Sequence, residues 1–339
     1  MEKVQKVNEM LVVSASPHIR SKHKTSSAMR LVIIALLPAL IFATYLFGLR
    51  ALLIAVISIL AAIGAEAVIQ RMLGRKITIT DGSAILTGLL LAFNLPPGVP
   101  WWLPAVGSAF AIIFAKQLFG GLGYNFINPA LAGRAFLMAS WPSLMTKEWL
   151  APIGGTLSGI DGISAATPLS LLKNPANYGN PEIIIRQLND FDTIKNIFLG
   201  KIGGCVGETS AFFLLIGGLF LLFLRIIDYR IVFGYLGSFA LLAWLLPTQG
   251  SVAFHLFAGG LVLGAFFMAT DWVTSPVTKK GRWIFGIGCG VITIIIRIWG
   301  GYPEGVSYSI LLMNVFTPVI DRLTKERIFG EVKKKGVKK

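Results

Sequence analysis

The chain has 339 residues, of which 55% are hydrophobic and 14% are charged, and its formal net charge is +15. An ordinary soluble domain carries roughly 25% charged residues, so this chain has too few polar side chains for a water-exposed fold or for a disordered chain. A large basic excess suggests nucleic-acid binding in a soluble protein, but in a membrane protein it reports which side the loops face.

Ten uncharged or nearly uncharged runs predict membrane-spanning helices. They cover about residues 31–49, 51–70, 82–93, 99–115, 125–140, 207–224, 231–246, 252–270, 283–299 and 306–320. A helix of about 20 apolar residues crosses the hydrocarbon core of a bilayer, and the Pro-Pro pair at 96–97 separates the third run from the fourth. We therefore expect an all-α polytopic membrane protein with about ten transmembrane helices.

The charges between these runs orient the predicted helices. With the N-terminus inside, 23 of the 31 Lys and Arg residues fall on the inner side, as the positive-inside rule requires. The chain then divides into a cytoplasmic N-terminal segment, a first group of helices, one long extracytoplasmic loop, a second group of helices and a basic cytoplasmic tail, with boundaries 1–30, 31–140, 141–206, 207–320 and 321–339. The basic excess thus indicates the orientation of the chain in a membrane and contact with its lipid, and no nucleic-acid partner.

The third and eighth predicted helices end in similar ways. The third runs into Asn94-Leu-Pro-Pro97, and the eighth runs into Thr270-Asp271 with Ser275-Pro276 just beyond. Because five helices precede the long loop and five follow it, a duplication of the five-helix unit would be inverted in the membrane. The sequence is equally consistent with two inverted five-helix repeats and with no repeat.

One segment of the long loop has an unusual composition. Asp161-Gly-Ile-Ser-Ala-Ala-Thr167-Pro-Leu surrounds Thr167 with small residues, and Pro168 favours an extended backbone at that threonine. No His or Cys lies nearby in the sequence to activate the hydroxyl as a nucleophile. The hydroxyl is therefore either a modification site or part of an ordinary Ser/Thr-rich turn, and the residues alone favour the turn.

The chain as a whole resembles the NqrB/RnfD family of membrane proteins. Its members belong to the Rnf-type ion-translocating electron-transport complex and to the sodium-pumping NADH:quinone reductase. The matching segments keep their order along almost the whole chain and lie at 81–88, 121–130, 161–169, 207–210, 270–276 and 314–321. One departure is Ala165, where the family often has Gly or Ser.

The resemblance implies a covalent flavin. In this family the threonine at the position of Thr167 carries FMN through a phosphoester bond, which a separate flavin transferase forms on the outer face. The flavinylation motif would include Asp161, Gly162, Ser164 and Ala166. A second, non-covalent flavin such as riboflavin between the two halves stays an open alternative.

The resemblance also implies partner subunits. The chain has no nucleotide-binding domain and no iron–sulfur cysteines, so it would act only within a complex of other membrane and peripheral subunits. These would include a second flavinylated subunit and iron–sulfur subunits, and the complex would couple electron transfer between ferredoxin and NAD to the translocation of Na⁺ or H⁺. The short N-terminal segment favours this branch over the quinone reductase.

Arg134 is the most informative charge within the predicted helices, because it lies deep in the fifth helix beside Asn128 and must face protein or cofactor. We expect Arg134 to hold a phosphate or a flavin carbonyl, or to pair with Glu208 or Asp271. These residues and Asn128 are candidate flavin-binding residues.

Glu208-Thr209-Ser210 opens the sixth predicted helix directly after the flavin-bearing segment. A helix N-terminus with Thr and Ser can bind a phosphate, although Glu208 would repel it, and the alternative is a simple helix cap. Both interpretations stay open.

Two acids are candidates for a coupling-ion site. Asp81 begins the third helix, where it is equally well explained as an acid stabilised by the helix dipole. Asp271 ends the eighth helix and is a candidate ion or flavin ligand, or an interfacial acid. Glu66 and Arg297 lie near helix ends, where we expect them to extend toward the interface. The two Cys and three His are scattered, so we expect no other metal site.

Two other functions would fit parts of the sequence. A secondary transporter or channel accounts for ten helices and an inverted repeat but not for the segment around Thr167. A purely structural membrane anchor leaves Arg134 and the intramembrane acids unexplained. A flavoprotein component of an electron-transport complex is the function that accounts for all of these features.

Overall fold

The computed structural model describes residues 25–150, 152, 167–173, 175, 180–208, 210–302 and 304–325. Every regular element within these ranges is a helix, as the sequence predicts. Three helices are each long and apolar enough to cross a membrane: α1 (Thr25–Phe47), α2 (Leu49–Met72) and α14 (Lys279–Trp299). The chain is a membrane-spanning helical protein, and the count of ten spans stays a prediction.

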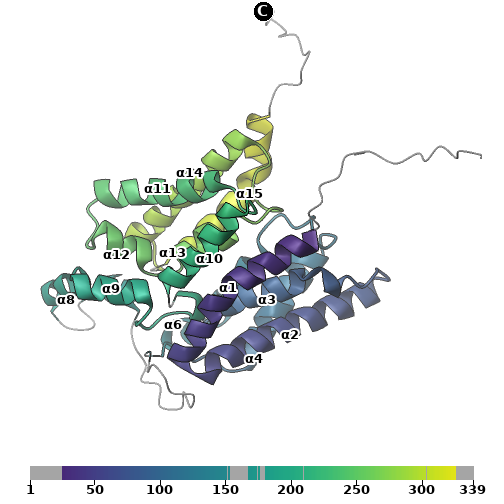
Figure 1. The fold of residues 1–339 in the computed structure, drawn as a ribbon, viewed down its shortest axis with the longest axis horizontal. Helices are drawn as coiled ribbons and strands as arrows, with labels where there is room; N and C mark the ends of the chain where they lie inside the picture. Colours follow the sequence, from purple (N-terminus) through teal and green to yellow (C-terminus); the bar gives the residue numbers. More distant parts are fainter. Residues whose placement is uncertain are drawn as a thin grey trace, which may run out of the picture.

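The first half of the chain forms one helical group (Figure 1, purple to blue). After α1 and α2 it contains η1 (Ile79–Asp81), α3 (Ser83–Phe93), α4 (Trp102–Phe110), the π-helix η2 (Ala111–Gln117) and α5 (Pro129–Ser140). α5 begins where it does because the Asn128 side chain accepts hydrogen bonds from the N–H groups of Ala130 and Leu131, and Pro129 at the first helical position has no N–H to satisfy.

The segment between the halves is largely helical within the described residues. It contains α6 (Pro142–Lys147), α7 (Pro168–Lys173), α8 (Pro181–Leu188), α9 (Phe191–Leu199) and the short η4 (Val206–Glu208). Leu169 and Leu172 of α7 share a small apolar core with Ile197 of α9, which fixes α7 against the rest of the protein. The proposed boundaries at 141 and 206 stay predictions.

The second half forms the other group (Figure 1, green to yellow). It contains α10 (Ala211–Phe223), α11 (Tyr229–Leu245), α12 (Val252–Phe257), α13 (Leu261–Leu263), the π-helix η5 (Gly264–Met268), α14 and α15 (Val306–Leu323). The prediction of one continuous helix over 252–270 is wrong. α12 ends before Gly259, whose φ of +72° is open to glycine but not to ordinary helical residues.

The two halves meet through helices at equivalent positions in each group. α1 packs against α10, and α5 packs against α15. A Cβ added at Gly217 of α10 would overlap the carbonyl oxygen of Ala35 in α1, so a glycine is needed for this close approach. An inverted duplication would produce this pairing, and the duplication stays a prediction.

Glu66 does not extend toward an interface, contrary to the sequence prediction. It is 1% exposed, and both its carboxylate oxygens lie 2.8 Å from Nζ of Lys116, which is equally buried. Lys116 also donates to Ser83 Oγ at 2.6 Å, and Gln117 donates to Glu66 at 2.7 Å. Burial of a charge requires such partners, and the sequence could not predict them because they come from two other helices, α3 and η2.

Candidate functional site

Thr167 lies at the N-terminus of α7. Its Oγ1 accepts a hydrogen bond from the N–H of Ser170 at 3.2 Å, and Ser170 Oγ donates to the Thr167 carbonyl at 2.7 Å. The side chain is 6% exposed. The hydroxyl oxygen is thus held at a helix terminus where backbone N–H groups also suit a phosphate oxygen. The other residues of the predicted flavinylation motif, Asp161, Gly162, Ser164 and Ala166, lie outside the described residues, as does Thr209.

α7 rests on the break between α12 and α13. A Cβ added at Gly259 would lie 2.6 Å from Leu169 Cδ1 and 3.5 Å from a guanidinium nitrogen of Arg297. Added at Gly260, it would lie 3.5 Å from Glu208 Oε1. The two glycines therefore let the helix that carries Thr167 approach a group of buried charges. We name this group the α7 cluster; it comprises Arg134, Lys173, Glu208, Arg297 and Glu304.

Arg134 is buried, as expected, but its partner is one that the sequence analysis missed. Its guanidinium pairs with the carboxylate of Glu304, and Nη1 donates to Asn94 Oδ1 at 2.9 Å. The predicted pairs with Glu208 and Asp271 are wrong. Glu304 follows α14 in a short connection, and only the folded chain brings it next to α5.

Glu208 has an incomplete set of partners. It is 6% exposed, and its Oε2 accepts from the backbone N–H of Cys205 at 3.4 Å, while Oε1 is buried with no hydrogen-bond partner among the described residues. The Cys205 Sγ and one oxygen each of Glu208 and Glu304 lie within 4.8 Å of one another. Most carboxylates this well buried have every oxygen bonded, so Glu208 stands out.

Arg297 ends α14 inside the protein, not at an interface, which corrects the sequence prediction. It is 7% exposed and donates to the backbone carbonyls of His255 (2.5 Å), Ala258 (3.1 Å) and Glu304 (3.1 Å). Lys173 likewise donates only to backbone carbonyls, those of Arg297, Gly300 and Tyr302. Neither cation has a carboxylate partner among the described residues.

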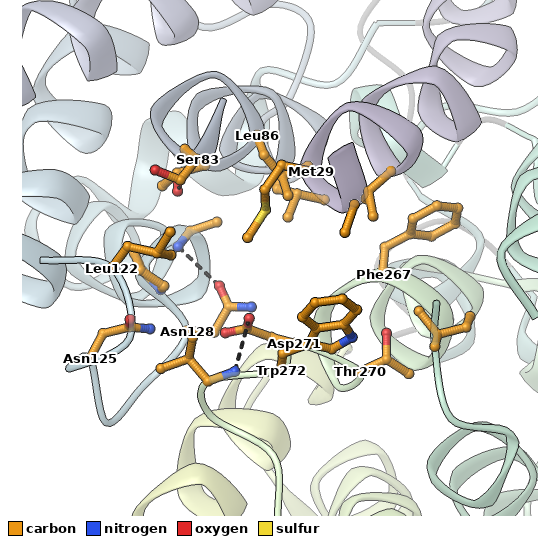
Figure 2. Close-up of a pocket in the computed structure, with 18 of the residues that line it drawn as sticks. Met29, Ser83, Leu86, Leu122, Asn125, Asn128, Phe267, Thr270, Asp271 and Trp272 are labelled. Carbon is orange, nitrogen blue, oxygen red and sulfur yellow. Dashed lines mark hydrogen bonds between the residues drawn. The ribbon is translucent and has the colours of Figure 1, made fainter. Parts of the chain in front are cut away.

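A second site lies at the N-terminus of α5. A cleft of about 90 Å³ between the two halves contains Asp271, and we name it the Asp271 cleft. In Figure 2 the Asp271 carboxylate and the Asn128 amide lie near its centre, with Ser83 and Asn125 on one side and Met29, Leu86 and Phe267 on another. Asp271 accepts from Thr274 Oγ1 at 3.0 Å and from the N–H of Val273 at 3.4 Å. Lys116 also lines the cleft.

Three other predicted residues have clear structural roles. Asn128 caps α5 and joins the halves, because its Nδ2 donates to the Met268 carbonyl at 3.3 Å and its N–H donates to Asn314 Oδ1 at 3.1 Å. Ser210 caps α10 through the N–H of Phe213. Asp81 accepts from the N–H and the hydroxyl of Ser83 at 2.7 and 2.6 Å.

The comparisons with known proteins agree with this architecture. Residues 12–330 match the model of the NQR2, RnfD, RnfE family. The chain belongs to this family. Its relatives include the D subunit of the Na⁺-translocating ferredoxin:NAD⁺ oxidoreductase complex of Acetobacterium woodii, which is 53% identical over 96% of this chain and 98% of the relative.

Two further relatives carry related names. The D subunit of the proton-translocating ferredoxin:NAD⁺ oxidoreductase complex of Clostridium ljungdahlii is 44% identical over 97% of this chain and 99% of that protein. The D subunit of an ion-translocating oxidoreductase complex of Stutzerimonas stutzeri is 42% identical over 88% of this chain and 90% of the relative. The family likeness therefore covers nearly the whole length of both proteins in each comparison.

Proposed function

We propose that this chain is the membrane subunit of an ion-translocating ferredoxin:NAD⁺ oxidoreductase complex and that it carries FMN on Thr167. The names of the relatives support the complex, and their likeness to this chain over nearly full length makes the same role the simplest one for it. The single observation that carries the flavin proposal is the position of Thr167, whose hydroxyl oxygen accepts from the Ser170 N–H at the start of α7, the helix whose Leu169 packs at Gly259 beside Arg297.

The residues around Thr167 fit a phosphoester. The N–H of Ser170 would donate to a phosphate oxygen as it now donates to Oγ1, and a phosphate gains charge-assisted hydrogen bonds at a helix N-terminus. FMN, when bound, supplies one- and two-electron chemistry, and the protein supplies its position and electrostatic environment. Lys173 and Arg297, which have no carboxylate partners among the described residues, would offset the added negative charge.

The need for partner subunits follows from the small number of cysteines in this chain. Its two Cys, at 205 and 289, are far apart in the sequence and both buried, so iron–sulfur centres would have to come from other subunits. We infer that these include iron–sulfur subunits and a second flavinylated subunit, and that a flavin transferase loads Thr167 on the extracytoplasmic side. Both termini would then be cytoplasmic, in a bacterial plasma membrane.

The coupling ion would pass through the Asp271 cleft. Asn128, which lines this cleft, lies six residues before Arg134 of the α7 cluster on the same helix, a rise of about 9 Å, so the ion path and the flavin site would be close neighbours. We propose Asp271 as the ion ligand in preference to Asp81, because Asp271 lines a cleft between the two halves and Asp81 is engaged as a helix-terminal acid. A non-covalent flavin such as riboflavin is the alternative occupant of this cleft.

The decisive experiment looks for the covalent flavin. The complex would be purified from its native membrane, denatured and separated on a gel, and this subunit would be examined for flavin fluorescence and for the mass increment of phosphoester-linked FMN. We expect both signals in the wild type and in Thr193→Ala, a matched threonine change on α9, and neither in Thr167→Ala.

Co-purification of the other subunits with Thr167→Ala would exclude a folding defect as the cause of the loss. A wild-type subunit without covalent flavin would contradict the proposal and favour a transporter or channel without a redox role. A flavin retained in Thr167→Ala would place the attachment at another residue and contradict the assignment of Thr167.

A further inference from the structure

A pocket that is separate from the Asp271 cleft lies beside α7. It encloses about 210 Å³. One wall is the face of α7 that bears Leu169, Leu172 and Lys173, and the opposite walls come from α12 and the end of α14. Exposed residues of the turn between α11 and α12 form its mouth, so the pocket opens to the surface. Its full lining is Leu169, Leu172, Lys173, Pro247, Thr248, Gln249, His255, Arg297 and Ile298.

The charges in this pocket are unbalanced. Lys173 and Arg297 line it, and none of the described residues that line it is acidic. The whole α7 cluster has three cations and two carboxylates, and Glu304 is engaged by Arg134. Partial burial lowers the pKa of the Lys173 ammonium, which reflects the cost of holding this charge away from water. An anionic group in the pocket would offset that cost.

His255 also points to a ligand. Its side chain is 4% exposed and lines the pocket, and neither ring nitrogen has a hydrogen-bond partner among the described residues. A neutral imidazole has one N–H donor and one acceptor, and leaving both unpaired in a buried site is unfavourable because neither recovers the hydrogen bond it made with water. Buried polar groups in folded proteins are seldom left in this state unless a ligand or an ordered water completes them.

We propose that this pocket receives the pyrimidine edge of a flavin ring tethered at Thr167. This inference rests on the proposed function. The pyrimidine edge has carbonyl oxygens and an N–H group, so it can both accept from and donate to His255, and it carries the negative charge of the reduced ring. Lys173 and Arg297 would stabilise that charge, and the leucines of α7 would contact the apolar part of the ring.

The dimensions agree with this placement. α7 has six residues and is therefore about 9 Å long, so the ribityl phosphate chain of FMN is comparable in length to the distance from Thr167 to Lys173. A cavity of about 150 Å³ in another protein admits a benzene ring, so this pocket can admit one edge of a three-ring system. The tether and the pocket wall are the same helix, which would limit the positions that the ring can explore.

The test measures the midpoint potential of the threonine-linked flavin in the purified complex. Lys173→Met removes a positive charge beside the reduced ring, so we expect the oxidised form to gain at least tenfold relative to the reduced form. This corresponds to a fall of about 59 mV for a one-electron couple. Lys173→Arg, which keeps the charge, should restore most of the potential. Lys195→Met on the exposed surface of α9 is the matched control and should leave it unchanged.

Gln249→Glu provides a second variant that is safe for folding, because Gln249 is exposed at the mouth of the pocket and the two side chains have the same shape. Adding a negative charge there should also lower the potential. If both Lys173→Met and Gln249→Glu retain covalent flavin at the wild-type potential, the pocket does not hold the ring. Absence of covalent flavin from the wild type would instead remove the proposed function, so the two failures are distinguishable.

Discussion

Two buried groups of charges in this protein are built in opposite ways. In the Glu66–Lys116 pair, 2.8 Å apart, Gln70 and Gln117 also donate to Glu66 Oε1, and Lys116 also donates to Ser83. In the α7 cluster, Glu208 Oε1 lacks a partner among the described residues, and Lys173 and Arg297 have no carboxylate there. A buried charge is costly unless it is paired and hydrogen-bonded. The first group therefore holds helices together, whereas the second keeps charge and hydrogen-bonding capacity that the described residues do not use.

The largest loss of stability is expected from breaking the Glu66–Lys116 pair. Lys116→Met would leave the Glu66 carboxylate buried without its counter-charge, which should reduce the free energy of unfolding by about 3–5 kcal/mol. The measurement is thermal unfolding of the detergent-solubilised protein. The double variant Lys116→Met, Glu66→Gln should recover much of the loss, and the exposed Lys76→Met should match the wild type. Equal stability of the Lys116 and Lys76 variants would remove the basis of the comparison.

Arg134→Met should have the next largest effect on stability. Its partner Glu304 is partly accessible, at 14% exposure, so water can offset some of the loss. We expect a decrease of about 2 kcal/mol, consistent with the loss of hydrogen bonds to charged groups. Thermal unfolding of the same preparation measures it, with the isosteric Glu304→Gln as a second probe of the pair. A decrease as large as that of Lys116→Met would mean that the α7 cluster is as tightly paired as the inner network.

Glu208→Gln should change stability by less than about 1 kcal/mol, because one of its carboxylate oxygens makes no hydrogen bond that would be lost. Glu66→Gln, the same chemical change in the Glu66–Lys116 pair, is the control and should destabilise the protein several times more. Removal of the Glu208 charge should also raise the potential of a flavin on Thr167, opposite in sign to Lys173→Met. Large destabilisation by Glu208→Gln would show that this carboxylate has a structural role.

The smallest effect is expected at a third, more accessible group of charges. Burial alone would raise the pKa of Asp228, but the N–H of Arg230 and the guanidinium of Arg282 outweigh it and lower the pKa below its ordinary value of 3.8. The contribution of the ionised Asp228 to the free energy of unfolding is therefore complete above pH 3.8 and is lost as the pH falls through the lowered pKa. The unfolding temperature would be measured from pH 7 down to pH 3. Near pH 3 it should fall less steeply with decreasing pH in Asp228→Asn than in the wild type. Identical profiles would mean that water screens the pair completely.

Much of the fold could be predicted from the sequence, because apolar runs and charge bias are properties of single segments. The start of α5 follows from a local rule of this kind, because Asn128 caps the helix and Pro129 occupies its first position. The break at Gly259 was missed, since an apolar run with two glycines also suits a continuous helix. Its cause is tertiary: Arg297 binds the carbonyl of Ala258, which the broken helix leaves free.

The candidate site could be predicted only in part, because its contacts also join residues that lie far apart in the sequence. Arg134 was recognised because a charge in an apolar helix must face a partner, but Glu304 was not, because it lies 170 residues away in the chain. His255, Lys173 and Arg297 are individually ordinary in the sequence. What sets them apart is that neither ring nitrogen of His255 has a hydrogen-bond partner and neither cation has a carboxylate partner among the described residues, and only the folded chain shows this.

The hydrogen bonds that join the halves have a consequence for movement. Asn128 binds both Met268 and Asn314, and Asn314 in turn donates to the Thr274 carbonyl at 3.2 Å, so residues from both halves interlock beside the Asp271 cleft. A transporter that rocks one half against the other would have to break both Asn128 bonds in each cycle. We therefore expect a coupling ion at the proposed site to be admitted or released by rotation of single side chains and by the local electric field.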